Sequence, residues 1–466
     1  MAGGAFARHI RKSMSDHPAN YLPEVRNQYE ALPYPPRDPE EDRQRLVLTW
    51  LEDLPMINHY CFAGKQSFRN NFRVLIAGGG TGDATIFMAE QLKAIGAADA
   101  QVVHLDMSEA SIAIAKKRAD IRGLSNISWV HDSLLNLPQL AGKLGQFDYI
   151  NCSGVLHHLA DPDAGFKALQ SVLRRTGESQ GQMPGAIGLM VYATVGRTGV
   201  YQMQQLMRLV NGAHPDVQHK IKNTRDLLAS LPPGNWFKRS EDLHHDHKLG
   251  DAGIYDLLLH SQDRSYTVGE LFDWLGNAAD GAPNGHGMHL AFTDVQRGLS
   301  PYLPHMVLGK KPPAMLAALR KLPRRQQFEA AELMGGSIIT HSLYVTQDAS
   351  SVAPYGDAAC IPFYFHEPLT GAMAAQVFGT NRGQPFVLNH QHSGISLTVN
   401  PGRYGARILG LIDGQKSFGE IFDQFRAEWK GQAAAPNNEV LFADFAESYE
   451  TLNALDRLLL RFPEQA

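Results

Sequence analysis

The chain has 466 residues, of which 44% are hydrophobic and 19% are charged, and its formal net charge is −4. This length predicts about three domains, and the composition is that of a globular protein with sizeable cores. The absence of a long basic run argues against nucleic acid as the main partner, because binding to phosphates needs a clustered cationic face. No run of about 18 apolar residues occurs, so we expect no membrane span.

The three cysteines, Cys61, Cys152 and Cys360, are far apart and form no C-x-x-C pair. Neither a disulfide framework nor a structural zinc site is therefore expected. Residues 1–17 lack the apolar segment of a secretory signal. A reducing compartment is the simplest interpretation, and we expect a cytoplasmic protein.

Residues 1–69 are expected to be helical with a loop in the middle. Glu41 to Leu54 is an amphipathic stretch that predicts a helix, with acidic residues at its positive end. The prolines from Pro33 to Pro36 predict an extended or turn segment. Tyr29 and Tyr34 flank this segment.

Val74 to Ala77 is a short apolar run that predicts a buried strand, and a helical pattern runs from Asp83 to Leu92. Glycines 78, 79, 80 and 82 join the two, which is the opening of a βαβ unit. Glycines let the backbone approach a ligand closely, although a tight turn without a ligand would show the same pattern. An acid at position 83 would repel a pyrophosphate, and it suits a ligand with a positive centre. S-adenosyl-L-methionine carries both an ammonium and a sulfonium.

Four further strands are expected, at residues 101–106, 127–132, 147–153 and 186–192. The first ends in Asp106, 24 residues after Gly82, where a carboxylate can accept both hydroxyls of a ribose. The second ends in Asp132, which could accept the exocyclic amine of an adenine. Because ligands of open α/β sheets bind at the carboxyl ends of the strands, these acids and the glycine turn are expected to meet.

The sequences VLIAGGGTGDAT, HLDMS, HDSLLNLP and FDYINCSGVLHHLADP make residues 70–195 resemble a class I S-adenosylmethionine-dependent methyltransferase. The resemblance implies a Rossmann-like α/β domain. It places Gly78, Gly80 and Gly82 along the methionine part of the cofactor, Asp106 at the ribose, Asp132 with Ser133 at the adenine, and Ser153 to Leu156 beneath the sulfonium. The complete set of expected cofactor-binding residues is Gly78, Gly79, Gly80, Gly82, Asp83, Asp106, Met107, Asp132, Ser133, Ser153 and Gly154.

Methyl transfer from a sulfonium is an in-line displacement, in which the enzyme mainly holds the acceptor behind the methyl group. A base is needed only when the acceptor arrives protonated, as a lysine with a pKa of about 10.4 does. His157 is the preferred titratable candidate, followed by Tyr192 and His158. Tyr34 is a further catalytic candidate, because Tyr29 and Tyr34 could close over the cofactor as a lid, as in related methyltransferases. Alternatively, Tyr29 and Tyr34 pack their loop onto the sheet, and each of the other three candidates could equally be a core or rim residue.

Residues 196–300 are expected to form a mostly helical insertion or dimerisation-type region. Within it, Asp256, His260, Asp263 and Arg264 form a dense ionisable group. Arg264 could clamp a carboxylate and His260 could accept a proton, or an Asp263–Arg264 ion pair could fix a turn. The histidines of residues 244–247 have poor spacing for a metal and predict an exposed polar loop, so no metal site is expected.

Residues 301–370 are expected to form a small α+β middle domain with a strand at 337–345. Residues 371–466 are predicted to be winged-helix-like, with two strands and helices at 403–411, from Ser417 to Trp429, and from Ser448 to Leu460. The second of these helices lacks a basic face, which favours protein contact or packing over DNA binding.

The order of NQYEALPYP, HSQDRSYTV, LMGGSI and ILGLIDG around the 70–195 domain resembles bacterial methyltransferases with appended regulatory regions, including the rickettsial-type protein lysine methyltransferases. The expected function is methyl transfer to a protein side chain, such as lysine. The alternatives are a small-molecule N- or O-methyltransferase and a non-catalytic cofactor-binding regulator. An enclosed, aromatic-lined cavity beside the sulfonium would favour a small molecule, and a long acidic open groove would favour a protein. The expected partner is the methyl acceptor, and a homodimer is possible.

Overall fold

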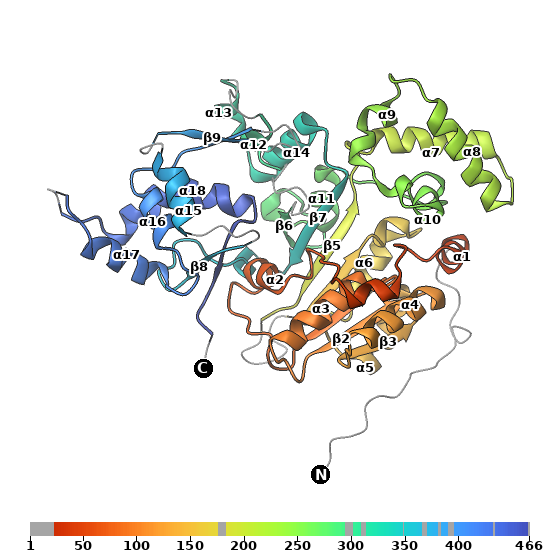
Figure 1. The fold of residues 1–466 in the computed structure, drawn as a ribbon, viewed down its shortest axis with the longest axis horizontal. Coiled ribbons are helices and arrows are strands. Elements are labelled where there is room, and N and C mark those ends of the chain that lie inside the picture. Colours follow the sequence, from red (N-terminus) through yellow and green to blue (C-terminus); the bar gives the residue numbers. More distant parts are fainter. Residues whose placement is uncertain are drawn as a thin grey trace, which may run out of the picture. The chain divides into compact units, whose positions relative to one another are not determined.

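The structure is a computed structural model, and it describes residues 23–175, 183–293, 302–308, 314–347, 349–365, 371–380, 384–389, 396–431 and 434–464 (Figure 1). Residues 1–22 lie outside the described residues. The prediction that no secretory signal is present falls on them, as does part of the predicted N-terminal helical segment. No helix in the described part is both long enough and apolar enough to cross a bilayer.

The chain divides into two compact units. Unit 1 comprises residues 1–53, 68–267 and 337–342, and unit 2 comprises residues 54–67, 268–336 and 343–466. The five-part division expected from the sequence is finer than this one and stays a prediction.

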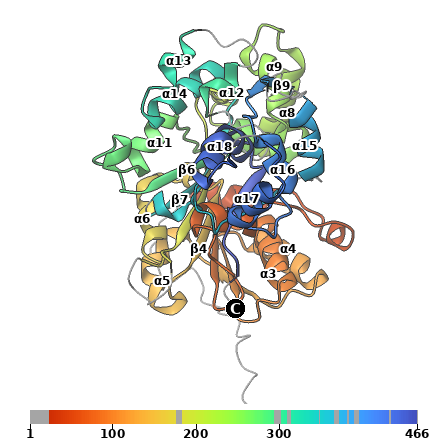
Figure 2. The ribbon, with the colours of Figure 1, turned by 90° about the vertical axis from the view of Figure 1, so that its left-hand side faces the viewer.

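The centre of the fold is a parallel sheet that contains all five predicted strands. β1 (Arg73–Ala77) pairs with β2 (Gln101–Asp106) and β4 (Tyr149–Ser153), β2 pairs with β3 (Ile127–His131), and β4 pairs with β5 (Ala186–Tyr192). Residues 74–77 of β1 are completely buried, as expected of a strand covered on both faces. α3 (Asp83–Ala94) and α4 (Glu109–Ile121) lie on one face, and α5 (Leu137–Leu144) and α6 (Pro162–Gln170) lie on the other (Figure 2).

The sheet continues beyond the five predicted strands. Its complete order among the described residues is β3-β2-β1-β4-β5-β7-β6, in which β6 is His289–Thr293 and β7 is Thr340–Thr346. The strand expected in a separate middle domain therefore joins the central sheet. The order reverses between β1 and β4, so the carboxyl ends of these two strands flank the switch point where a ligand is expected.

The helix expected from Glu41 to Leu54 is wrong. The chain forms α1 (Pro23–Ala31) and a 3₁₀ turn, η2 (Pro39–Arg43), and the next helix, α2 (Leu54–Cys61), begins where the expected helix ends. Pro55 lies in the first turn of α2, where its missing N–H costs no hydrogen bond. The Leu51 carbonyl accepts the hydroxyl of Tyr149, and the Glu52 carbonyl accepts the side chain of Gln91 at 2.9 Å.

The rest of unit 1 is mostly helical. Its first helix after the sheet, α7 (Thr198–Asn211), buries Val200 and Met203 against Phe237 and Leu258. A short π-helix, η7 (Tyr255–Leu259), carries Asp256 and ends at His260. The remaining elements are η3 (Leu134–Asn136), η4 (Leu156–His158), α8 (Val217–Ser230), α9 (Trp236–Ser240), η5 (Glu241–Leu243), η6 (Asp246–Lys248) and α10 (Asp251–Ile254).

Unit 2 has its own core, in which Phe418 and Phe422 of α17 (Phe418–Ala427) pack with Phe445 of α18 (Asn438–Ala454). Ser417 caps α17 as predicted, in a capping box with Glu420. The other described elements of unit 2, apart from α2 and the strands named elsewhere, are α11 (Val268–Leu275), η8 (Ala278–Asp280), α12 (Pro304–Leu308), α13 (Leu316–Leu319), α14 (Arg324–Gly335), η9 (Ala349–Ser351), α15 (Gly371–Thr380), β9 (Phe386–Asn389), β10 (Ser396–Val399) and α16 (Gly405–Leu411). The winged-helix-like character of this end of the chain stays a prediction.

The helix expected from Ser448 to Leu460 is also wrong. α18 begins earlier and ends at Ala454, and β11 (Leu458–Arg461) follows it and pairs with β8 (Ile361–Tyr364). Asp456 has a φ of +52° between the two elements, which ends the helical path. Its buried carboxylate accepts hydrogen bonds from the hydroxyls of Tyr60 at 2.6 Å and Thr293 at 2.8 Å.

Burial raises the pKa of Asp456 to about 6. The folded protein then binds this proton more tightly than the unfolded chain does, so the stability from the protonated carboxyl is present below pH ~4 and is lost as the pH rises through about 6. We expect the free energy of unfolding of the wild type, relative to that of Asp456→Asn, to fall by about 3 kcal/mol over this window. The melting temperature of the wild type should fall with it. Calorimetry at a series of pH values measures this difference. Asp423→Asn, at an exposed position on α17, is the control, and parallel pH profiles of wild type and Asp456→Asn would contradict the prediction.

Candidate functional site

The glycine turn between β1 and α3 is tied to the end of β2. Gly78, Gly80 and Gly82 have φ angles of +78°, +51° and +101°, which other residues rarely adopt. The N–H groups of Gly78 and Gly79 donate to the carbonyl of Leu105 at 2.8 and 3.1 Å. A Cβ on Gly79 would lie 2.3 Å from the ring of His104. Glycine is therefore required both by the backbone angles and by the space around the turn.

The carboxylate of Asp106 lies directly against this turn. One oxygen accepts the N–H of Gly80 at 2.7 Å, and the other accepts the N–H of Ser108 at 2.8 Å. Burial raises the pKa of Asp106, and these backbone donors act in the opposite direction. Each oxygen keeps a lone pair for another donor.

Asp132 adjoins Asp106 at the end of the neighbouring strand. The N–H of Asp132 donates to the carbonyl of Asp106 at 3.1 Å. Its Oδ1 accepts the N–H of Ser133 and the side-chain amide of Asn136, both at 2.7 Å. The carbonyl of Met107 lies 3.1 Å from the ring of His131. The structure thus brings the two predicted acids and their neighbours to one edge of the sheet.

The end of β4 completes this edge. The side-chain amide of Asn151 donates to the hydroxyl of Ser153 at 2.9 Å, and Gly154 has a φ of +76°. A Cβ on Gly78 would lie 2.4 Å from the side chain of Val155. Ser153 and Gly154 therefore lie beside the glycine turn, at the switch point.

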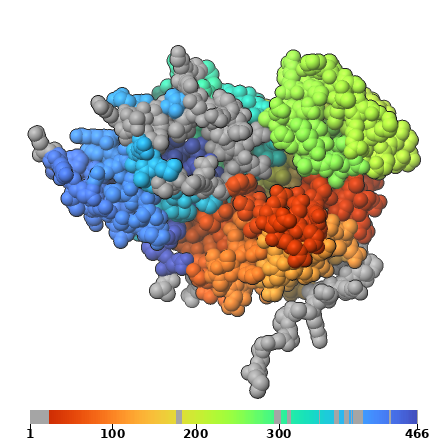
Figure 3. All heavy atoms as spheres, in the orientation of Figure 1, coloured from red at the N-terminus to blue at the C-terminus, as the bar shows by residue number. Residues whose placement is uncertain are grey.

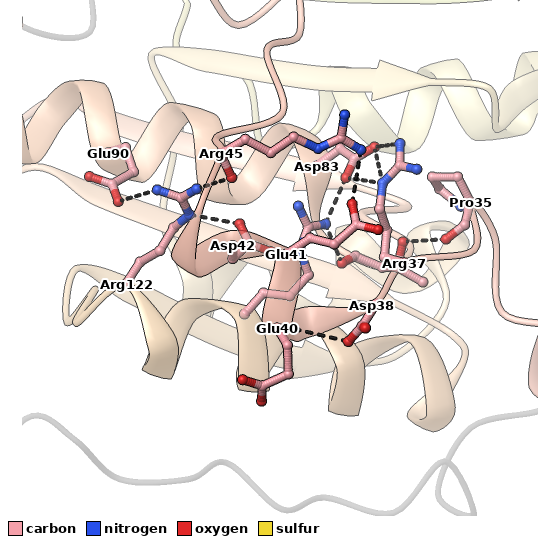
Figure 4. Close-up of polar contacts among 12 residues, drawn as sticks. Pro35, Arg37, Asp38, Glu40, Glu41, Asp42, Arg45, Asp83, Glu90 and Arg122 are labelled. Atoms are coloured by element: carbon pink, nitrogen blue, oxygen red, sulfur yellow. Dashed lines mark hydrogen bonds and ion pairs between the residues drawn. The ribbon is translucent and has the colours of Figure 1, made fainter.

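The carboxylate of Asp83 is occupied by two arginines. Arg37 donates to both of its oxygens, at 2.9 Å from Nε to Oδ1 and 2.5 Å from Nη2 to Oδ2 (Figure 4). Arg118 donates to Oδ1 at 2.6 Å. Burial would raise the pKa of Asp83, but the hydrogen bonds and charge of Arg37 together with Arg118 outweigh it and lower the pKa. A direct contact of Asp83 with a cofactor stays a prediction.

The segment before β1 lies over the glycine turn. The hydroxyl of Thr81 donates to the carbonyl of Pro35 at 2.7 Å, and a Cβ on Gly80 would lie 2.7 Å from the carbonyl oxygen of Tyr34. The hydroxyl of Ser108 donates to the carbonyl of Tyr29 at 3.2 Å. Figure 3 shows this N-terminal segment as a continuous surface over the part of unit 1 that follows it. These contacts pack the segment against the turn, and the lid role of Tyr29 and Tyr34 stays a prediction.

Arg118 anchors this segment from inside. Its Nε donates to Asp42 at 2.5 Å and its Nη1 to the carbonyl of Thr81 at 2.9 Å, and the side chains of Arg118 and Asp42 are only 1% and 3% exposed. Arg122 donates to the second oxygen of Asp42 at 2.7 Å and to Glu90 at 3.2 Å (Figure 4).

A second polar group lies at the ends of β4 and β5. We call it the Asp256 cluster, and it consists of Tyr29, His158, Tyr192, Asp256 and His260. The Asp256 carboxylate accepts the hydroxyls of Tyr29 at 3.0 Å and Tyr192 at 3.3 Å. The rings of His158 and His260 stack with centroids 3.8 Å apart, and a nitrogen of each lies within 4.8 Å of an Asp256 oxygen.

Asp256 forms no ion pair among the described residues, and it is 3% exposed. Burial raises its pKa. A buried carboxylate of this kind gains strongly from a cation placed beside it.

The catalytic candidates have different surroundings. His157 stacks on Tyr192 with centroids 3.8 Å apart, and neither of its ring nitrogens has a hydrogen-bond partner among the described residues. Burial lowers the pKa of His157 well below its ordinary value, so the ring is neutral and a weak base. The hydroxyl of Tyr34 donates to Asp246 at 3.2 Å, and burial raises the pKa of Tyr34. The catalytic roles of His157, Tyr192 and Tyr34 stay predictions.

Two expectations near His260 are wrong. Asp263 does not pair with Arg264: it lies 3.7 Å from the guanidinium of Arg197 and accepts the side-chain amide of Gln204 at 2.9 Å. The loop at 244–247 is not uniformly exposed, because His244 is 1% exposed and stacks on Phe237. Sequence reasoning also gave no role to Asp256, although its spacing of four residues from His260 on a helical pattern places both on one side of a turn.

Comparison with known proteins gives a consistent result. Residues 75–179 match the family model described as a methyltransferase domain. An uncharacterized protein from Synechococcus sp. is 29% identical over 317 residues, which are 67% of this chain and 68% of the relative. The fold is similar to PKMT2 from Rickettsia typhi, with a TM-score of 0.50 and 13% identity over 96% of this chain and 77% of that chain. For the structure of the same protein in complex with AdoHcy, the TM-score is 0.52 and the identity is 14%, over 90% of this chain and 77% of that chain.

The Arg118 anchor generates a stability prediction. Arg118→Met should lower the free energy of unfolding by about 3 kcal/mol, because it removes one of the two cations that neutralise the buried Asp42. Chemical denaturation followed by circular dichroism measures this change. Lys117→Met is the matched control, since the neighbouring Lys117 is exposed and lies 3.4 Å from Glu40 in a surface pair whose loss should cost less than about 0.5 kcal/mol. Equal losses in the two variants would show that the anchor does not stabilise the fold.

Proposed function

We propose that this chain, a class I S-adenosylmethionine-dependent methyltransferase, methylates a cationic amine, and specifically the side chain of lysine in a protein. The observation that carries the choice of an amine is the buried carboxylate of Asp256, which forms no ion pair within the described part of the chain and lies among the rings of its cluster at the ends of β4 and β5.

The residues at the switch point fit the nucleoside of S-adenosylmethionine. The two oxygens of Asp106 can each accept a ribose hydroxyl in addition to the backbone N–H that they already hold. The Oδ2 of Asp132 accepts no hydrogen bond from the described residues, so it is available to an adenine amine. We assign Gly78, Gly79, Gly80, Gly82, Met107, Ser133, Ser153 and Gly154 to the same pocket.

When S-adenosylmethionine is bound, it supplies an electrophilic methyl group: the acceptor lone pair forms the new bond to carbon, and the electron pair of the breaking S–C bond stays on sulfur. The residues of this chain have to hold the acceptor in line and keep its nitrogen unprotonated at that moment. They have little charge to stabilise in the displacement itself.

The environment of Asp256 favours nitrogen over oxygen as the acceptor atom. The charges of His158 and Arg197 act on Asp256, but burial outweighs them and raises its pKa. An ammonium would bring a further positive charge next to this carboxylate, and the methylated product is again a cation. The ring of Tyr29 can also attract an ammonium through its face, whereas the ring of Tyr192 already stacks on His157 and carries the guanidinium of Arg197 at 3.6 Å. A neutral hydroxyl would add no positive charge at this carboxylate.

Two observations support a lysine side chain. A lysine places its ammonium at the end of a thin four-carbon stem, which suits a buried cluster. The chain also resembles the rickettsial-type protein lysine methyltransferases in sequence order, and its fold is similar to PKMT2 over 90% or more of its length. The second candidate is a small-molecule amine, because the cluster is buried and lined by rings, which an enclosed pocket for a small acceptor also requires. The match of residues 75–179 to a methyltransferase domain supports catalysis over a non-catalytic regulator.

Incubation with tritiated S-adenosylmethionine and a cell lysate, split into protein and small-molecule fractions, tests the acceptor class. We expect label in protein, and acid hydrolysis should yield methylated lysine, because the cluster accepts a thin cationic side chain. Heat-inactivated enzyme is the control. Label confined to the small-molecule fraction would replace the lysine proposal by the second candidate.

The assignment of Asp106 makes a separate prediction. Asp106→Ala should weaken the binding of S-adenosylmethionine by about 1.5–3 kcal/mol, because it removes hydrogen bonds to a charged acceptor. Calorimetric titration measures the affinity. Asp120→Ala, at an exposed position on α4, is the control and should bind as the wild type does. Unchanged affinity of Asp106→Ala would remove Asp106 from the pocket.

A further inference from the structure

We propose that the Asp256 cluster is the acceptor site, in which Asp256 holds the ammonium of the acceptor and His158 takes its proton. This inference rests on the proposed function. It gives a role to Asp256, for which the sequence predicted none, and to His158, which ranked behind His157 as a candidate base.

The proton position on His260 follows from its neighbours. The backbone N–H of Gln262 donates to Nδ1 of His260 at 3.1 Å, so this nitrogen carries a lone pair. Burial lowers the pKa of His260 to about 2, and the ring is therefore neutral, with its single proton on Nε2. Nε2 lies 3.4 Å from the hydroxyl of Tyr29, which itself donates to Asp256. His260 thus completes a chain of donors that ends at the Asp256 carboxylate.

His158 has the opposite arrangement. Its Nδ1 lies 2.8 Å from the backbone carbonyl of Gln262, which can only accept, so Nδ1 carries the proton and Nε2 carries the lone pair. One residue, Gln262, therefore sets opposite tautomers in two stacked rings: His260 is a donor toward the cluster, and His158 is an acceptor. A base needs this free lone pair.

An ammonium fits this set of groups better than a metal ion does. An ammonium donates N–H groups, and the cluster offers a carboxylate and an imidazole lone pair to receive them. A metal bound by His158, Asp256 and His260 would need lone pairs from both histidines, whereas Nε2 of His260 carries a proton as long as Gln262 donates to Nδ1. His158, Asp256 and His260 are therefore arranged to bind an amine rather than a metal ion.

The proton moves from the acceptor to His158 in a single step. The acceptor R–NH₃⁺ gives one proton to Nε2 of His158, leaving R–NH₂ with a free lone pair and His158 as an imidazolium. Asp256 stabilises the cation on either side of this transfer, since both the ammonium and the imidazolium lie within its field. His158 returns its proton to solvent after the methylated ammonium has left.

The binding test uses n-butylammonium as a mimic of the lysine side chain and n-pentanol as a neutral control of similar shape. Both are titrated calorimetrically into the full chain saturated with S-adenosylhomocysteine. We expect the wild type to prefer the cation, and Asp256→Asn to weaken its binding by about tenfold or more through loss of a charged hydrogen bond. Asp226→Asn, at an exposed position on α8, should bind as the wild type does.

The second test follows tritium transfer from S-adenosylmethionine to n-butylamine as a function of pH. His158→Gln should lose about tenfold or more of the rate at pH 7.5, in the range of a lost general base. Its rate should recover toward that of the wild type near pH 10, where free amine is abundant. A purely structural role of His158 would give a uniform loss at all pH values. His219→Gln, an exposed histidine of α8, is the control.

Several results would overturn the inference. The first is that the wild type does not bind n-butylammonium. The second is that Asp256→Asn binds it as tightly as the wild type does and His158→Gln transfers methyl groups at the rate of the wild type. Stoichiometric metal in the purified wild type, lost in both variants, would make the cluster a metal site instead. If the wild type labels protein lysine in lysate and both variants do so equally well, this inference fails while the proposed function stands. If the wild type labels no lysine, the proposed function fails.

Discussion

The hydrogen bond from the N–H of Gly80 to the carboxylate of Asp106 is the contact on which the site depends, because it joins the glycine turn after β1 to the acid that ends β2. The turn exists only because positions 78, 80 and 82 are glycines with positive φ, and the acid reaches it only because β1 and β2 are parallel and in register. Asp132 then adds its own N–H to the Asp106 carbonyl. Three strand ends are thus fixed relative to one another by backbone donors, which is the preorganisation that a bound nucleoside requires.

The acid at the start of α3 has a structural partner that its sequence position does not reveal. Asp83 lies where a carboxylate is stabilised by a helix N-terminus, yet Arg37 and Arg118 take its oxygens. The same Arg118 holds Asp42 and the carbonyl of Thr81. The ion-pair network therefore attaches the segment at 35–43 to the glycine turn. From the sequence, Asp83 is expected to repel an anionic ligand. In the structure, two arginines largely balance the charge of Asp83, so this repulsion is weaker than the sequence suggests.

The parts that the sequence predicted well are those determined by local pattern. The five strands, the glycine turn, the acids at strand ends and the Ser417 cap all follow from a few neighbouring residues. In place of the predicted helix at 41–54, the carbonyls of Leu51 and Glu52 accept side chains that lie far along the chain. The predicted helix at 448–460 fails because Leu458 pairs with Tyr364 in a distant strand. The Asp256 cluster could not be read from sequence for the same reason. Tyr29 and Asp256 are 227 positions apart, and only the folded chain brings them together.

Tyr29 connects the two halves of the site, and this explains why the segment before the sheet matters to chemistry. Its carbonyl accepts the hydroxyl of Ser108, two residues after the acid of β2, while its own hydroxyl donates to Asp256. A single residue thus sets the distance between the acid expected at the ribose and the carboxylate expected at the acceptor. In-line displacement is sensitive to an error of about 1 Å in this distance. The Arg118 network holds residues 35–43, which follow Tyr29 in the chain. Under the proposed assignment, these buried contacts contribute to the alignment of the methyl donor and the acceptor.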